Sequence, residues 1–453
     1  MISAKPILKI CIYALMVTAL WVPVQIHASE PDNTPLALEQ IIQIALEANL
    51  DIKAAGKETE AAAFAKKSSR AEFYPTLNTT YQYKYNEEEI VIPESQFQSE
   101  TVITPWNEYA FSFSATQPLF TGFAITNQYK LAELGLDMAK ANQKLVRQDV
   151  VLDATRAYFE ILKAEKLLSV SKETVRQVSA QTDVVKNFYD VGMSPLNDLL
   201  ESQVLLAEAK QQVVFATNNL EIARSNMNRL LRRPTHQSIA VVDMLDVAPI
   251  AYDLDTSIQM ALDNRIEIGM SDLEVDLAKK DIELAKQTYY PSVNLQYNYY
   301  RFGEEDEWHV NLAEDGLNPD DLSVWDIRAI ASWNIWDWGK TSNATREKKS
   351  RLSKARLNRE KLKDAIRLSV TQAFLTMQTA GRNIATIETA IEQAQENVRI
   401  NEERFKEQVA TSTDVLTAQT LLARTMNSYY SALYDFNIAK AALYREMGQE
   451  YSE

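Results

Sequence analysis

The chain of 453 residues has one cysteine, three histidines and ten glycines, and each shortage excludes a class of protein. The only cysteine, Cys11, lies in an apolar run that follows Lys5 and Lys9. This pattern predicts a secretory signal peptide over residues 1–28. The mature chain then has no disulfide and no thiolate metal site, and its remaining histidines predict no metal centre.

Basic charge and long apolar runs are also scarce. The chain has 47 basic and 62 acidic residues, for a net charge of −15, which argues against nucleic acid as a partner. Beyond the signal, no apolar run of about 18 residues predicts a membrane-spanning helix. No nucleophile–base pair, glycine-rich phosphate loop or Cys/His cluster is present, so we expect neither an enzyme nor a bound cofactor. Few glycines suit a small number of very long elements.

The chain does contain a long internal repeat. Residues 74–85 read YPTLNTTYQYKY and residues 290–300 read YPSVNLQYNYY, and their prolines lie 291 − 75 = 216 residues apart. This repeat shift relates most of the mature first half to the second without a gap. Because solenoid repeats have periods of about 20–50 residues, the pattern predicts a duplicated half-molecule instead. We expect two tandem structural repeats, residues 29–250 and 251–453.

Each repeat carries two segments that alternate apolar or aromatic with polar residues, the period of a β-strand. The predicted strands are residues 77–86, 108–118, 293–302 and 324–336. About ten residues are enough for a tilted strand to cross a bilayer. A half-exposed sheet in a soluble domain would show the same alternation. Four such segments, with aromatic residues at their ends and an export signal, favour a membrane barrel.

Three features flank these strands, and each has two interpretations. Acidic residues at 87–89 and 304–307 form loops that are either solvated or bind calcium. Tryptophans between 325 and 338 fit either an interfacial girdle or core packing. The basic run within 340–367 fits either a solvated helix face or contact with anionic lipid head groups.

A long helical hairpin follows each strand pair, at about residues 123–232 and 339–447. In the second hairpin apolar residues recur at alternating steps of four and three, which is the seam of a left-handed coiled coil. This seam begins Ile366, Val370, Ala373, Met377, Ala380 and Ile384. The hairpins are expected to turn near residues 192–195 and 408–411.

Four strands cannot close a barrel, and an open sheet edge in lipid leaves backbone groups unsatisfied. Several copies must therefore share one barrel, with closed cyclic symmetry. Two chains would give eight strands, whose interior side chains would nearly fill. Three chains would give twelve strands and a polar lumen. We expect a mainly α protein with membrane β-strands, in which a trimeric 12-stranded barrel continues as a helical coiled-coil barrel.

Three motifs recur in both halves, in the same order over essentially all of the mature chain. They are Tyr-Pro-x-Leu/Val-Asn at 74–78 and 290–294, Pro-Leu-Phe-Thr-Gly at 118–122 with a counterpart at 335–340, and residues 191–203 with a counterpart at 404–419. In these motifs the chain resembles the TolC family of outer-membrane efflux proteins. The resemblance implies an outer-membrane homotrimer with a periplasmic α-helical tunnel. It also implies passive export, by efflux or type I secretion, of substrates delivered by an inner-membrane pump and a periplasmic adaptor.

The resemblance also implies where the adaptor docks. In the first turn Val191, Gly192 and Met193 match the family's docking residues. In the second turn the corresponding positions are Gln408, which stands in place of a glycine, and Val409.

The family narrows its tunnel with aspartates just after the second turn. Asp414 matches one of them, and Thr417 stands at the other. In the family's closed state a tyrosine and an arginine pair with a first-half aspartate; here these positions are Phe405 and Ala410, beside Asp198. The resemblance thus implies an acidic ring with a weakened latch.

The physical argument for the ring does not depend on the resemblance. A threefold axis would bring three copies of Asp414 together, and such a ring favours cations. Alternatively, Asp198 and Asp414 are first-turn carboxylates that interact with their helix dipoles, and both roles can hold together. The competing hypothesis for the whole chain is an exported coiled-coil scaffold without channel activity.

Overall fold

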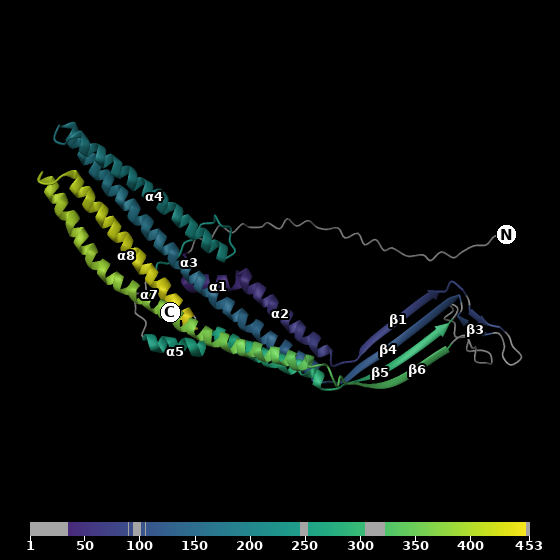
Figure 1. Cartoon of the computed structure of the whole chain (residues 1–453). Helices are drawn as coiled ribbons and strands as arrows, with labels where there is room; N and C mark the ends of the chain where they lie inside the picture. Colours follow the sequence, from purple (N-terminus) through teal and green to yellow (C-terminus); the bar gives the residue numbers. More distant parts are fainter. Residues whose placement is uncertain are drawn as a thin grey trace, which may run out of the picture.

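The computed structural model describes residues 35–88, 90–93, 101–104, 106–244, 252–303 and 322–449. Figure 1 shows an elongated molecule with a sheet at one end and the turns of two long helical hairpins at the other. The predicted signal peptide and the second acidic loop, at 304–307, lie outside the described residues. Of the first acidic loop, Glu87 and Glu88 are described and lie exposed after the first strand.

The two halves have the same order of main elements. The first runs α1 (Leu38–Ala48), α2 (Leu50–Ala71), β1 (Thr76–Tyr85), β2 (Ile90–Ile92), β3 (Thr101–Thr104), β4 (Asn107–Thr121), α3 (Ala124–Asp190) and α4 (Leu196–Leu230). The second runs α5 (Leu254–Asn264), α6 (Ile266–Ala285), η1 (Gln287–Tyr289), β5 (Ser292–Gly303), β6 (Leu322–Ser332), α7 (Lys340–Lys406) and α8 (Ser412–Glu446). The repeat shift of 216 maps α1, α3 and α4 onto α5, α7 and α8 with identical bounds. The prediction of two tandem structural repeats is confirmed.

Left-handed backbone conformations occur at the same four points of each half. In the described part of the chain, the residues with positive φ form the pairs Gly122/Trp338, Phe123/Gly339, Gly192/Gln408 and Arg232/Gly448, each related by the repeat shift. Every pair contains one glycine and one residue with a side chain. The fold therefore requires the left-handed turn at these points, whichever residue type occupies it.

The four long strands form one antiparallel sheet in the order β1-β4-β5-β6, so the pair β4–β5 joins the two halves. Within the described residues, β1 and β6 each pair on one side only. The predicted fourth strand continued to residue 336, but β6 ends at Ser332, because Ser332 pairs with Ser292 at the start of β5. The short hairpin β2–β3 was not expected.

The tryptophans near the end of the sheet are exposed in the single chain. Trp325, Trp333, Trp336 and Trp338 have between 58% and 88% of their surface accessible. This exposure favours the girdle interpretation over packing in the core of the chain. Part of the basic run on α7 is ion-paired to α6, since Lys348 contacts Asp281 at 3.2 Å.

Two apolar clusters hold the helices together. The first surrounds Ile41, Tyr158 and Met227 and also includes Tyr434 of α8, so it joins the two halves. The second contains the predicted seam residues Ile366 and Val370 with Leu443. Consequently α8 packs between α7 of its own hairpin and α3 of the first one. None of the described helices is both long and apolar enough to span a membrane.

The helical segment before the first strand is divided at Asn49 into α1 and α2, although the apolar residues keep helical spacing from residue 38 to about residue 73. Asn49 adopts a non-helical ψ of 135°, and its side chain accepts a hydrogen bond from the N–H of Asp51 at 2.7 Å, which caps α2. Its counterpart is Arg265, with a ψ of 127°. The Arg265 guanidinium forms ion pairs with Glu267 at 2.6 Å and Glu446 at 2.5 Å.

Candidate functional site

The two hairpin turns share one backbone geometry. In the first turn, the N–H of Met193 donates to the carbonyl of Phe188 at 2.7 Å, and the N–H of Gly192 donates to Tyr189 at 2.9 Å. In the second turn, the N–H of Val409 donates to Arg404 at 2.9 Å, and the N–H of Gln408 donates to Phe405 at 3.1 Å. Both are Schellman motifs, which end a helix with a left-handed residue.

Gln408 adopts the conformation that a glycine would adopt. Its φ is 61°, and the φ of Gly192 is 78°. The replacement of glycine by Gln408 therefore leaves the path of the second turn unchanged.

Apolar side chains project from both turns into solvent. Val191 is 69% exposed, Met193 57% and Val409 63%. A Cβ atom added at Gly192 would meet nothing within 4 Å, so the first turn is also open at its centre. The end of each hairpin therefore presents apolar side chains to solvent.

Asp414 caps helix α8. Its Oδ2 accepts hydrogen bonds from the backbone N–H and the hydroxyl of Thr411, both at 2.8 Å, and its own N–H donates to the Thr411 hydroxyl at 3.2 Å. This is a capping box. These hydrogen bonds, assisted by the charge of Arg404, hold the pKa of the exposed Asp414 below its ordinary value. Asp414 is thus a first-turn carboxylate of its helix, which is one of the two roles expected from the sequence. Its lowered pKa keeps the carboxylate ionised at neutral pH.

Asp198 occupies the equivalent position of α4 with a weaker set of contacts. Pro195 stands at the N-cap and offers no side-chain cap. The hydroxyl of Ser194 donates to Asp198 Oδ2 at 3.3 Å. The two aspartates are equivalent in the backbone and different in their partners.

Phe405 makes an aromatic contact between the two hairpins. Its ring lies 5.6 Å from the ring of Phe188, centroid to centroid, at an interplanar angle of 33°. Nearby, the hydroxyl of Thr413 donates to Glu201 at 3.0 Å and links α8 to α4. The structure thus brings Phe405 to Phe188, a residue that the sequence analysis missed because one phenylalanine among many on a helix gives no signal.

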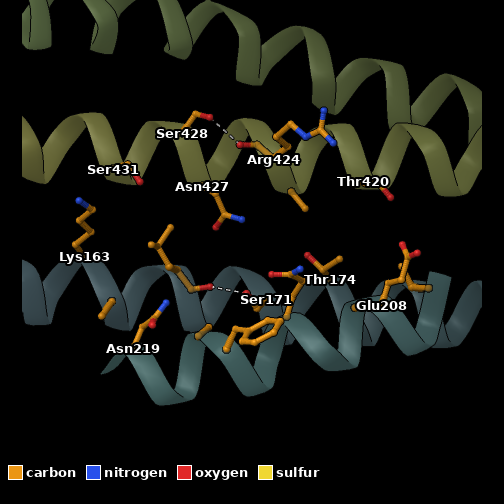
Figure 2. Close-up of a pocket in the computed structure, with 18 of the residues that line it drawn as sticks. Lys163, Ser171, Thr174, Glu208, Asn219, Thr420, Arg424, Asn427, Ser428 and Ser431 are labelled. Carbon is orange, nitrogen blue, oxygen red and sulfur yellow. Dashed lines mark hydrogen bonds between the residues drawn. The ribbon is translucent and has the colours of Figure 1, made fainter. Parts of the chain in front are cut away.

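A groove of 820 Å³ lies between α3, α4 and α8, on the helical part of the molecule (Figure 2). Small polar side chains line it, among them Ser171, Thr174, Asn219, Thr420, Asn427 and Ser428. The Oδ1 atom of Asn427 is buried there without a hydrogen-bond partner. Sequence analysis gave no indication of this groove, because its lining is spread thinly over three helices. Over the parts of the chain that the structure describes, no cluster of His, Cys, Asp and Glu is arranged to hold a metal ion.

The sequence pattern of the outer membrane efflux protein family matches residues 41–231 and 257–449, which together make up most of the chain. The chain belongs to the outer membrane efflux protein family. The two matches begin 257 − 41 = 216 residues apart, so the family pattern follows the repeat. As a member of this family the chain is an outer-membrane channel for efflux or secretion, with a helical part in the periplasm.

Individual relatives and a solved structure agree with this assignment. The chain is 22% identical to the outer membrane protein TolC of Vibrio cholerae over 91% of this chain and 90% of the relative. It is 22% identical to the outer membrane efflux protein BepC of Brucella suis, over 76% and 74% of the two chains. A crystal structure of CusC superposes with a TM-score of 0.78 at 16% identity, covering 91% of this chain and 92% of that one, which supports the same fold.

Proposed function

We propose that three copies of this efflux protein assemble into one tunnel that conducts substrates passively from the periplasm through the outer membrane. An inner-membrane transporter would supply the substrate, and a periplasmic adaptor would dock at the hairpin tips. The observation that carries the proposal is the open four-stranded sheet, whose β1 and β6 edges have no partner among the described residues.

These edges require a neighbour. A strand edge in lipid leaves N–H and C=O groups unsatisfied, each at a cost of several kcal/mol. Pairing β6 of one copy with β1 of the next satisfies both edges at once. Three copies give twelve strands, which is enough for a barrel with a polar lumen.

The helices support the same arrangement. Leu200 on α4 is 52% exposed, whereas its equivalent on α8, Leu416, is 1% exposed. The same contrast holds for Leu196 at 51% and Ser412 at 2%. Because α8 is covered by α3 of its own chain, α4 would be covered in the same way by α7 of a neighbouring chain.

The first test is the size and location of the assembly. We expect an SDS-resistant trimer in the outer-membrane fraction, with a native mass three times that of the processed chain. A monomer in the soluble periplasmic fraction would contradict the tunnel and favour the coiled-coil scaffold.

The adaptor is proposed to bind the exposed residues Val191, Gly192, Met193, Gln408 and Val409. Combining Val191→Asp with Met193→Asp should abolish export while leaving the amount of trimer unchanged, because both side chains are mostly exposed in the turn. Ile44→Asp, on an exposed position of α1 far from the turns, is the matched control. Normal export by the double variant would place docking elsewhere.

Asp414 is proposed to line the constriction, with Asp198 and Phe405 nearby. Asp414→Asn keeps an oxygen acceptor for Thr411 and removes the charge, so it should lower cation selectivity in planar bilayers with little loss of stability. Asp198→Asn, at the equivalent position, should change selectivity less. Unchanged selectivity in Asp414→Asn would remove Asp414 from the conducting path.

A further inference from the structure

Within one chain the two hairpins contact each other near their tips through a ring pair, beside the hydrogen bond of Thr413 to Glu201. Phe188 near the end of α3 stacks on Phe405 near the end of α7, with ring centroids 5.6 Å apart. Both side chains are half-buried by this contact.

The repeat shift converts this contact into a contact between chains. In a ring of three chains, the two hairpins of each chain would alternate around the axis. The second hairpin of one chain would then contact the first hairpin of the next chain in the way that the two hairpins of one chain contact each other. Phe188 then corresponds to residue 188 + 216 = 404, and Phe405 corresponds to residue 405 − 216 = 189 of the neighbour. These residues are Arg404 and Tyr189.

The backbone equivalence needed for this step is present at the tips. Helices α3 and α7 have bounds related by the repeat shift, and both end in the same hydrogen-bonded turn. Arg404 and Tyr189 are both exposed in the single chain, Tyr189 to 38%, whereas their counterparts Phe188 and Phe405 are half-buried. By the repeat shift, the two exposed side chains are those that would face the neighbouring chains of the proposed ring.

We propose that the guanidinium of Arg404 stacks on the ring of Tyr189 of the partner subunit, and that this pair latches neighbouring tips together. The latch rests on the proposed trimer. A guanidinium over an aromatic face within about 6 Å is a favourable cation–π contact, and arginine suits such stacking because its head group is planar.

The guanidinium of Arg404 is held by its own turn. Its Nη2 atom donates to the carbonyl of Val409 at 3.3 Å, which fixes the guanidinium beside the second turn. The contact within a chain is apolar, whereas the contact between chains carries a positive charge next to Asp414. The tips of neighbouring chains are therefore joined differently from the two tips of one chain.

Cysteine pairs test the geometry directly. In a Cys11→Ser background, a short bismaleimide cross-linker, which spans side chains too far apart for a direct disulfide, should link Tyr189→Cys/Arg404→Cys into covalent multimers up to the trimer on denaturing gels. Phe188→Cys/Phe405→Cys is the matched control, and it should give links within one chain only. A native trimer whose 189–404 pair stays unlinked, or links only within one chain, would overturn the latch, whereas a monomeric protein would overturn the proposed assembly itself.

Conductance tests the role. Because either substitution removes the cation–π pair, Arg404→Gln and Tyr189→Leu should each raise the open fraction of channels in planar bilayers about two- to fivefold. Tyr189→Phe keeps the ring and should retain the latch, and the Arg404→Gln/Tyr189→Leu double variant should open no further than either single variant. Additive effects in the double variant, or an equal opening in Tyr189→Phe, would overturn the role of this pair.

Discussion

At the scale of single residues, the left-handed positions show which constraint acts at each glycine. A side chain in this conformation costs roughly 1–2 kcal/mol. The hypothetical Cβ of Gly122 would lie 2.4 Å from the carbonyl oxygen of Gln287, so packing also requires glycine there. At Gly192 no atom lies within 4 Å of such a Cβ, and only the backbone conformation matters. Gln408 bears that conformational cost in the second turn.

We expect Gly192→Ala to destabilise the protein by about 1 kcal/mol and Gln408→Gly to stabilise it by about as much. Gly269→Ala, in an exposed position of helix α6 with equal free space, should stabilise by about 0.5–1 kcal/mol, because alanine is the better helix former. Denaturant unfolding of the detergent-solubilised protein measures all three. If Gly192→Ala and Gly269→Ala changed the free energy of unfolding in the same direction, the backbone φ angle would not decide the effect of the substitution.

At the scale of elements, the joint between α5 and α6 carries a charged network that has no counterpart at the described joint between α1 and α2. The carboxylate of Glu267 forms ion pairs with Arg265 at 2.6 Å and with Arg445 of α8 at 2.9 Å. Burial alone would raise the pKa of Glu267, but the hydrogen bonds and charge of Arg265, with a contribution from Arg445, lower it to about 2. The network ties the start of α6 to the end of α8.

We expect Glu267→Gln to lose roughly 3 kcal/mol of stability at neutral pH. Because the pKa is lowered on folding, this contribution is fully present above the ordinary glutamate value of 4.5 and is lost as the pH falls toward about 2. Thermal unfolding of wild type and variant between pH 7 and pH 2.5 should therefore converge at the acidic end. Asp51→Asn, the equivalent position in the first half, should cost less than about 1 kcal/mol. A gap between wild type and Glu267→Gln that is independent of pH would contradict the electrostatic origin.

At the scale of the whole molecule, the duplication predicts how copies would pair in the proposed barrel. In the chain, Phe113 of β4 pairs with Tyr299 of β5. The repeat shift turns this pair into residue 113 + 216 = 329 and residue 299 − 216 = 83 of the next chain, which are Ala329 and Tyr83. Strand β6 should therefore pair with β1 of its neighbour in the register of β4 and β5.

Cross-linking can check this register. In the Cys11→Ser background, Ala329→Cys/Tyr83→Cys should give a covalent trimer on non-reducing gels. Phe113→Cys/Tyr299→Cys, the equivalent pair inside one chain, reports whether a disulfide fits at this type of position and should migrate as a monomer. If Ala329→Cys were linked to a position one residue away from Tyr83, the strand pairing between chains would differ in register from the β4–β5 pairing within a chain.

The periodic parts of the fold could be predicted from the sequence, and the aperiodic parts could not. Alternation along β1 and the heptad seam around Ile366 are repeated signals, and the structure contains both elements. The break at Asn49 was missed because helical spacing continues on both sides of it. The end of β6 was missed because a strand stops where its partner stops, which alternation does not report. At the tips, Asp414 could be located by motif, whereas its capping by Thr411 and the Phe188–Phe405 contact depend on side-chain geometry.

The equal lengths of the two hairpins have a consequence for how such a channel can change over generations. In a ring of six identical chains with one hairpin each, a single substitution at the tip would change all six tips. In the proposed trimer each tip is encoded twice within one gene, so a mutation reaches only alternate tips of the ring. Gln408 opposite Gly192 shows that the two copies have already diverged in residue while keeping one backbone. One set of tips can thus remain under selection for an old partner while the other acquires a new one.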